Sequence, residues 1–175
     1  LDRTLLRINA LDEAAILALC ITARIPRAAG VPTIRLGIRI LSKLRLIKKK
    51  DLSSLLLKIL PPRNVKAAAA LLAANKHNYR EFFLKKQNEV IQENGVFVIA
   101  SASPEIIVEA FAHRLGVLFV ASSCDLTSTG NIEVTETIAG KKLKRLRELG
   151  FTDDELANAT FYSDNDTDIS DLVAV

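Results

Sequence analysis

The sequence predicts an α/β fold that combines a parallel sheet with one long helical segment. From Leu11 to about Glu89 the chain reads as helix almost throughout, without the alternation that marks a strand. From about Val90 onward, short β-prone runs alternate with helical runs. Such alternation is typical of parallel strands that are joined by right-handed helical crossovers. With 49% apolar and 25% charged residues in 175, the chain can bury a sizeable core.

The helical segment has apolar residues at helical spacing and prolines between its parts. One predicted apolar face contains Ala14, Ala15, Leu17, Ala18 and Ile21, and another lies in the alanine-rich run 65–74. We expect Pro26, Pro32 and the pair Pro61-Pro62 to separate successive helices, because proline removes a backbone donor.

The second half of the chain places a serine at a strand end. The expected elements are strands at 96–100, 117–121 and 159–162 and helices that begin at Pro104 and Lys141. Ser103 is expected to be the N-cap of the first of these helices, with Pro104 as its first residue. Ser101 then lies at the carboxyl end of a strand, where open α/β sheets bind ligands and helix N-termini attract anions.

An acidic stretch follows the last β-prone run. Asp164 and Asp168 are four residues apart, so their carboxylates can converge on one hard cation. Mg²⁺ prefers oxygen ligands and usually takes one or two protein carboxylates. Taken alone, both aspartates also fit turn or capping positions in a polar loop.

Four stretches of the chain resemble the motifs of the haloacid dehalogenase (HAD) superfamily, specifically its phosphoserine-phosphatase-like subfamily IB. They are the first motif, Leu1-Asp2-Arg3-Thr4-Leu5; the serine motif at 98–105, which contains Ser101-Ala102-Ser103-Pro104; the lysine motif at 140–146; and the acidic motif at 162–168. The four occur in the order of that family. The resemblance covers the start of the chain and residues 90–171.

The resemblance implies a Rossmann-like doubly wound parallel sheet with an inserted α-helical cap. Residues 1–11 and 90–175 would form the discontinuous core, and residues 12–89 the cap. The family also carries its catalytic nucleophile, an aspartate, at the position directly before Leu1. Because the chain contains no methionine and stops before the family's last elements, we expect the sequence to be an incomplete record of a longer protein.

By resemblance, the protein is an Mg²⁺-dependent phosphatase that hydrolyses a small phosphorylated metabolite through an aspartyl-phosphate. Asp2 would act as general acid and base, with Lys142 as the second catalytic residue. The implied phosphate-binding residues are Ser101, Ala102, Thr4 and Lys142. The implied Mg²⁺ ligands are Asp2, Asp164 and Asp168.

Several alternatives stay open. Lys141 and Lys144 compete with Lys142 for the phosphate. The protein can also be a non-catalytic module that binds an anion, a metal or a membrane surface. Arg35, Arg39 and Lys43 recur every four residues on one helical face, which suits an anionic membrane, the rim of a pocket or simple solvation.

Composition narrows the partners and the compartment. The net charge of +4 is modest, and the basic segment lacks interleaved aromatics, so we expect no nucleic-acid partner. Cys20 and Cys124 lie far apart, which favours free thiols in a reducing compartment, and we expect a cytoplasmic protein. The sequence leaves the oligomeric state open.

Overall fold

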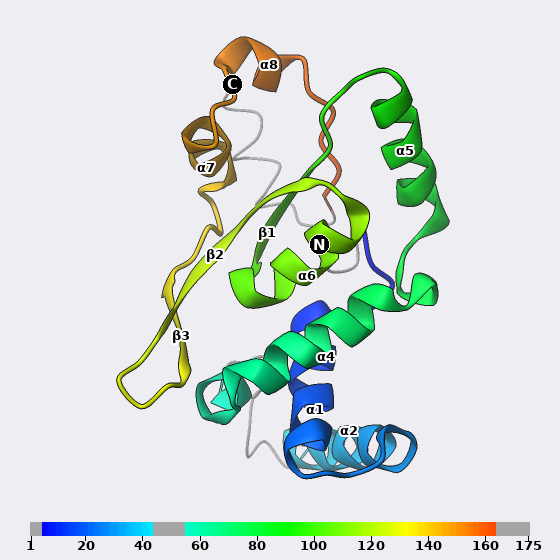
Figure 1. Cartoon of the computed structure of the whole chain (residues 1–175), viewed down its shortest axis with the longest axis vertical. Coiled ribbons are helices and arrows are strands. Elements are labelled where there is room, and N and C mark those ends of the chain that lie inside the picture. Colours follow the sequence, from blue (N-terminus) through cyan, green and yellow to red (C-terminus); the bar gives the residue numbers. More distant parts are fainter. Residues whose placement is uncertain (1–4, 44–54, 164–175) are drawn as a thin grey trace.

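The structure is a computed structural model that describes residues 5–43 and 55–163, including their side chains except those of residues 39–43. Figure 1 shows helices α1, α2 and α4 gathered at one end of the molecule and α7 and α8 toward the other, with the sheet between them. The first-half elements are α1 (Ala10–Thr22), α2 (Arg27–Lys43), a helical stretch at 55–59, α4 (Pro62–Ala74), the 3-10 turn η1 (Lys76–Asn78) and α5 (Glu81–Gln92). The predicted helical character of this segment is confirmed for the described residues.

Two of the three proline positions begin helices as predicted. Helix α2 starts directly after Pro26, and Pro62 is the first residue of α4, where its missing N–H costs nothing. The predicted break at Pro32 is wrong, because Pro32 lies inside α2. The proline ring fixes φ at a value that a helix accepts. Because proline has no backbone N–H, the carbonyl of Ala28 loses its helical hydrogen bond, but Ala28 is exposed and its carbonyl can accept a hydrogen bond from water instead.

The second half of the described chain contains a three-stranded sheet. Its strands lie in the order β1 (Val98–Pro104), β2 (Leu118–Leu126), β3 (Ile132–Glu136). Strands β1 and β2 are parallel and are connected by α6 (Glu105–Leu115), so the predicted crossover unit is confirmed. Strand β3 pairs antiparallel with β2 and was not predicted. Its signal was the turn Thr127–Asn131, in which Gly130 takes a left-handed φ of 75°.

The boundary between β1 and α6 differs from the prediction: the strand, expected at 96–100, runs from Val98 to Pro104, and the helix begins one residue later than expected. Pro104 is the N-cap and Glu105 the first helical residue, so Ser103 is not the cap. Strand β1 continues to Pro104 because its register against β2 shifts between Ser101 and Pro104, which lengthens the pairing.

The predicted strand at 159–162 is also wrong. After α7 (Lys142–Glu148) and α8 (Asp153–Ala157), residues 158–163 form no helix or strand. A strand exists only beside a hydrogen-bonded neighbour, and within the described ranges no strand pairs with this segment. Its β-prone side chains therefore do not suffice to make it a strand.

One hydrophobic cluster joins the helical end of the molecule to the sheet. It contains residues of α1, α4, α6 and β1, and its largest fully buried side chain is Phe111. The alanine-rich face of α4 packs against both α1 and α6, since small side chains allow the helix axes to approach closely. A second cluster contains Val120, Ile138, Leu143, Leu146 and Leu156, and it fixes α7 and α8 on the other side of the sheet. The division into core and cap stays a prediction.

A short bridge ties the first described residues to the start of α5. Leu6 pairs antiparallel with Tyr79, and the amide of Arg80 donates to the carbonyl of Leu5 at 3.0 Å. Tyr79 is buried, and its hydroxyl donates to the carbonyl of Ala73 at 2.7 Å. The bridge therefore holds Leu5, the last residue of the first motif, against α5.

Among residues 5–43 and 55–163, no helix has the length and apolar character that crossing a bilayer requires.

We predict that Tyr79 makes stability fall at high pH. Burial raises the pKa of Tyr79 to about 12, an effect that Arg114 partly offsets, whereas an unfolded tyrosine has a pKa of about 10. Because the folded-state pKa is above the unfolded one, the contribution of Tyr79 to the free energy of unfolding is complete below about pH 10. It is lost as the pH rises toward about 12. Urea unfolding measured at about pH 8 and at about pH 11 gives the loss of unfolding free energy between the two conditions. This loss should be smaller for Tyr79→Phe than for the unsubstituted protein. Tyr162→Phe, at the other tyrosine, is the control and should keep the full loss.

Candidate active site

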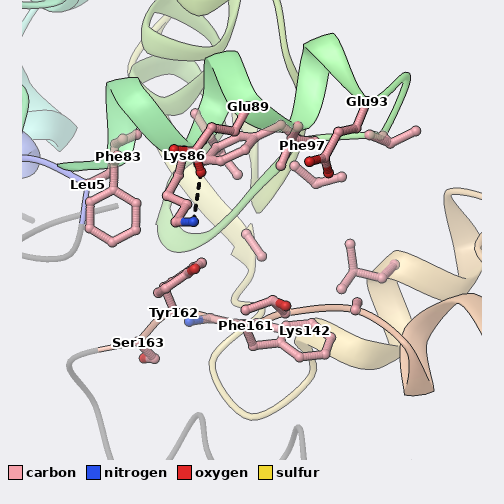
Figure 2. A pocket seen from close by; sticks show the side chains of 18 residues that line it. Leu5, Phe83, Lys86, Glu89, Glu93, Phe97, Lys142, Phe161, Tyr162 and Ser163 are labelled. Atoms are coloured by element: carbon pink, nitrogen blue, oxygen red, sulfur yellow. Dashed lines mark hydrogen bonds and ion pairs between the residues drawn. The ribbon is translucent and has the colours of Figure 1, made fainter. Parts of the chain in front are cut away.

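A pocket of about 430 Å³ opens between α5, β1, α7 and the segment 159–163. Figure 2 shows side chains of α5 on one wall and Lys142, Phe161, Tyr162 and Ser163 on the opposite wall. The other lining residues are Leu5, Phe83, Lys86, Glu89, Val90, Glu93, Val96, Phe97, Val98, Ile99, Ala100, Leu146, Ala159 and Thr160.

All four motifs contribute residues to the lining of this pocket. Leu5 ends the first motif, Ala100 directly precedes the serine of the serine motif, and Ser163 directly precedes the aspartates of the acidic motif. Lys142 belongs to the lysine motif and lines the pocket itself. Stretches that are far apart in the sequence thus meet around one cavity.

The carboxylates expected to hold a metal lie outside the described residues. Asp2, Thr4, Asp164 and Asp168 all belong to that part of the chain. Among residues 5–43 and 55–163, no group of three histidine, cysteine, aspartate or glutamate side chains is placed to hold a metal ion. The predicted Mg²⁺ site therefore depends on the first and acidic motifs, whose carboxylates have the oxygen chemistry that Mg²⁺ prefers.

The structure separates the three candidate lysines by their surroundings. Lys142 is the first residue of α7, and the buried Leu143 and Leu146 fix that helix against the sheet. Lys141 pairs with Glu136 at 3.5 Å, and Lys144 pairs with Glu148 at 3.8 Å. Among the three, Lys142 is the one that lines the pocket, which favours it as the phosphate-binding lysine.

Ser101 is buried at the end of the regular β1–β2 pairing, opposite Ala121. Its Oγ accepts a hydrogen bond from the amide of Ser103 at 3.1 Å. A hydroxyl has one proton and two lone pairs, so this bond leaves the proton to be donated elsewhere. Neither Ser101 nor Ala102 lines the pocket; Ala102 has an exposed side chain, and Ala100 marks where the pocket ends along β1.

Three aromatic rings hold the segment 159–163 against α5. Tyr162 makes edge contacts with Phe82 and Phe83, with ring centroids 5.7 and 5.3 Å apart, and the two phenylalanines contact each other at 5.1 Å. Such pairs stabilise by roughly 0.5–1.5 kcal/mol beyond the area they bury. The cluster anchors the chain one residue before Ser163.

An ion pair in the pocket was not predicted from the sequence. Lys86 donates to Glu89 at 2.7 Å, and Figure 2 shows the pair on the α5 wall. This hydrogen bond raises the pKa of Lys86 and lowers that of Glu89. The three-residue spacing on one helix was its signal. Glu93 adds another carboxylate on the same wall.

The pocket continues into an apolar groove of about 350 Å³ along the outer side of β1. Val96, Val98 and Ala100 form one side of this groove, and Phe151 and Leu156 lie among the residues opposite. Strand β1 is an edge strand in the described part of the chain, so its outer backbone faces this groove without a neighbouring strand.

The basic helix face is only partly described. Arg35 forms an ion pair with Glu13 at 2.5 Å, so one of the three cations already has a carboxylate partner within the chain. The side chains of Arg39 and Lys43 lie outside the described residues. Membrane-surface contact through this helix stays a prediction.

A comparison with protein families decides the family. The model of the haloacid dehalogenase-like hydrolases matches residues 1–172, nearly the whole chain. The protein is a HAD-like hydrolase. This membership confirms the predicted α/β, Rossmann-like fold class. HAD-like hydrolases are generally enzymes, most often phosphatases that use Mg²⁺ and an aspartyl intermediate.

Known structures support the fold of this HAD-like hydrolase. A crystal structure of a protein of unknown function from Bordetella pertussis Tohama I is 16% identical, with a TM-score of 0.57. The match covers 85% of this chain and 70% of that one. At this identity the likeness concerns the fold alone. No curated protein matches the chain.

We predict that Tyr162→Ala loosens the segment 159–163 of this HAD-like hydrolase. The substitution removes both ring contacts to α5, which we expect to lower the free energy of unfolding by about 1 kcal/mol. Amide hydrogen exchange should accelerate at 159–163 more than in α6. Tyr162→Phe keeps the ring and should behave as the unsubstituted protein; equal acceleration in both variants would contradict the aromatic anchor.

Proposed function

We propose that this HAD-like hydrolase is an Mg²⁺-dependent phosphatase of the phosphoserine-phosphatase-like subfamily IB, acting on a small phosphomonoester. The observation that carries the proposal is the convergence of Leu5, Ala100, Lys142 and Ser163 on one pocket. Each of these residues belongs to one of the four motifs that carry the groups expected for phosphoryl transfer. The reaction needs an in-line nucleophile, a divalent cation and donors for the non-bridging oxygens.

The proposed reaction has two steps. The aspartate expected directly before Leu1 attacks phosphorus, and the alcohol leaves with a proton from Asp2. Asp2 then takes a proton from water, which hydrolyses the aspartyl-phosphate and releases inorganic phosphate. Mg²⁺, held by the backbone carbonyl of Asp2 and by the carboxylates of Asp164 and Asp168, would supply charge neutralisation for the phosphoryl oxygens.

The remaining groups bind and orient the phosphate. Ser101, which directly follows the pocket residue Ala100, has its hydroxyl proton left to donate, and Lys142 brings a positive charge to the pocket itself. The backbone of Ala102 would add a further contact, and Thr4 would orient the first motif. The free thiols Cys20 and Cys124 support the proposed cytoplasmic location.

Hydrolysis of a generic aryl phosphate by the full-length protein tests this proposal. We expect turnover with Mg²⁺, none with EDTA, and a loss of about 100-fold or more for Asp2→Asn, because general acid–base catalysis contributes about that factor. Circular dichroism checks that the variant folds. Magnesium-independent turnover, or full activity in Asp2→Asn, would overturn the mechanism.

The three lysines provide a matched series. Lys142→Ala should weaken inhibition by inorganic phosphate about tenfold or more, since it removes a charge-assisted hydrogen bond. Lys141→Ala and Lys144→Ala should change the inhibition constant less than about twofold, because their partners are surface glutamates. If Lys141→Ala or Lys144→Ala has the largest effect, Lys142 is not the phosphate-binding lysine.

A further inference from the structure

Ser122 lies on β2, the central strand of the described sheet, and contacts both the serine motif on β1 and the loop between β3 and α7. It is fully buried. Its hydroxyl donates to the carbonyl of Ala102 at 2.7 Å and accepts from the amide of Ile138 at 3.3 Å. Ala102 belongs to the serine motif, and Ile138 begins the loop that leads to the lysine motif.

On one side, Ser122 helps to fix the peptide between Ala102 and Ser103. The carbonyl of this peptide accepts from Ser122, and its N–H donates to Ser101 Oγ at 3.1 Å. Both polar ends of one rigid plane are therefore held by serine hydroxyls. Since a peptide unit is planar, rotating its carbonyl away from Ser122 also moves the N–H that orients Ser101.

On the other side, Ser122 fixes the loop before α7. The side chain of Ile138 is fully buried, and its carbonyl accepts from the amide of Lys141 at 3.0 Å. Gly140 makes the intervening turn with a left-handed φ of 67°. Lys142 follows directly, so the Ser122 contact acts on the loop that carries this lysine.

We propose that Ser122 is a positioning residue that couples Ser101 and Lys142, so that both address the same phosphate. The inference rests on the proposed phosphatase function and deepens it. One hydroxyl bridges the two motifs across β2. Losing it leaves the carbonyl of Ala102 and the amide of Ile138 without this partner, which permits both segments to shift.

Inhibition of the full-length protein by inorganic phosphate, measured with the aryl phosphate substrate, tests the coupling. We expect Ser122→Ala to raise the phosphate inhibition constant about tenfold, because it removes the buried hydrogen bonds to Ala102 and from Ile138 that position the two segments. Ser123→Ala is the control: the hydroxyl of this neighbouring serine accepts a hydrogen bond from Arg145 at 3.5 Å, whereas the bonds to Ala102 and Ile138 are made by Ser122, so the constant should change less than about twofold. Ser122→Thr keeps the hydroxyl and should restore most of the affinity.

A double-mutant cycle separates positioning from a merely structural role. If Ser122 acts through Ser101, Ser122→Ala should change the inhibition constant less than about threefold in a Ser101→Ala background. The change that remains in this background is attributed to the displacement of Lys142. Fully multiplicative effects, or a fall in unfolding free energy with an unchanged inhibition constant, would overturn the proposal. If Ser122→Ala does not fold, Ser122→Cys replaces it, and a wild-type constant in that variant overturns the proposal.

Amide exchange distinguishes this inference from the phosphatase proposal itself. Should the unsubstituted protein neither turn over the aryl phosphate nor bind phosphate, the proposed function fails, and with it the catalytic purpose of the coupling. Hydrogen exchange at Ser103 and Ile138 then decides the geometry. Faster exchange at both amides in Ser122→Ala, but not in Ser123→Ala, supports one hydroxyl holding both segments, and unchanged exchange overturns it.

Discussion

The parallel pairing of β1 with β2 is the interaction on which the rest of this structure depends. It brings Ser101 opposite Ala121, and the crossover helix α6 that it requires provides the surface on which α4 packs. The same pairing puts Ser122 beside the serine motif, from which one hydroxyl reaches Ala102 on one side and Ile138 on the other. Sheet register, helix packing and the alignment of two motifs therefore share one physical origin.

The candidate site lies where rigid elements meet segments that have few hydrogen-bonded neighbours. Helix α5 and strand β1 form one side of the pocket, whereas the segment 159–163 is held on the other side mainly through aromatic contacts of Tyr162. The outer edge of β1 is lined by apolar side chains and faces a groove rather than a strand. Strand β1 and helix α7 therefore fix the positions of the serine and lysine motifs, and the side chains of the motifs supply the polar groups.

Among the cations of the lysine motif, Lys142 is the one that lines the pocket. Neighbouring cations have carboxylate partners: Lys141 and Arg145 both reach Glu136, and Lys144 reaches Glu148. These pairs are largely exposed and contribute little to stability. The pairs give Lys141, Lys144 and Arg145 carboxylate partners outside the lining of the cavity, whereas Lys142 belongs to that lining.

The sequence by itself determined the α/β class, the helical first half and the order of the motifs, because periodicity, prolines and glycines act locally. It also indicated Lys142 without separating it from Lys141 and Lys144. The tertiary structure decided what depends on neighbours: whether 159–162 has a partner strand, where the β1 register shifts, and that Pro32 is tolerated beside an exposed carbonyl. The Ser122 bridge belongs to the same class. Hydrogen bonds between distant segments are not encoded in any local pattern, so only the folded chain reveals them.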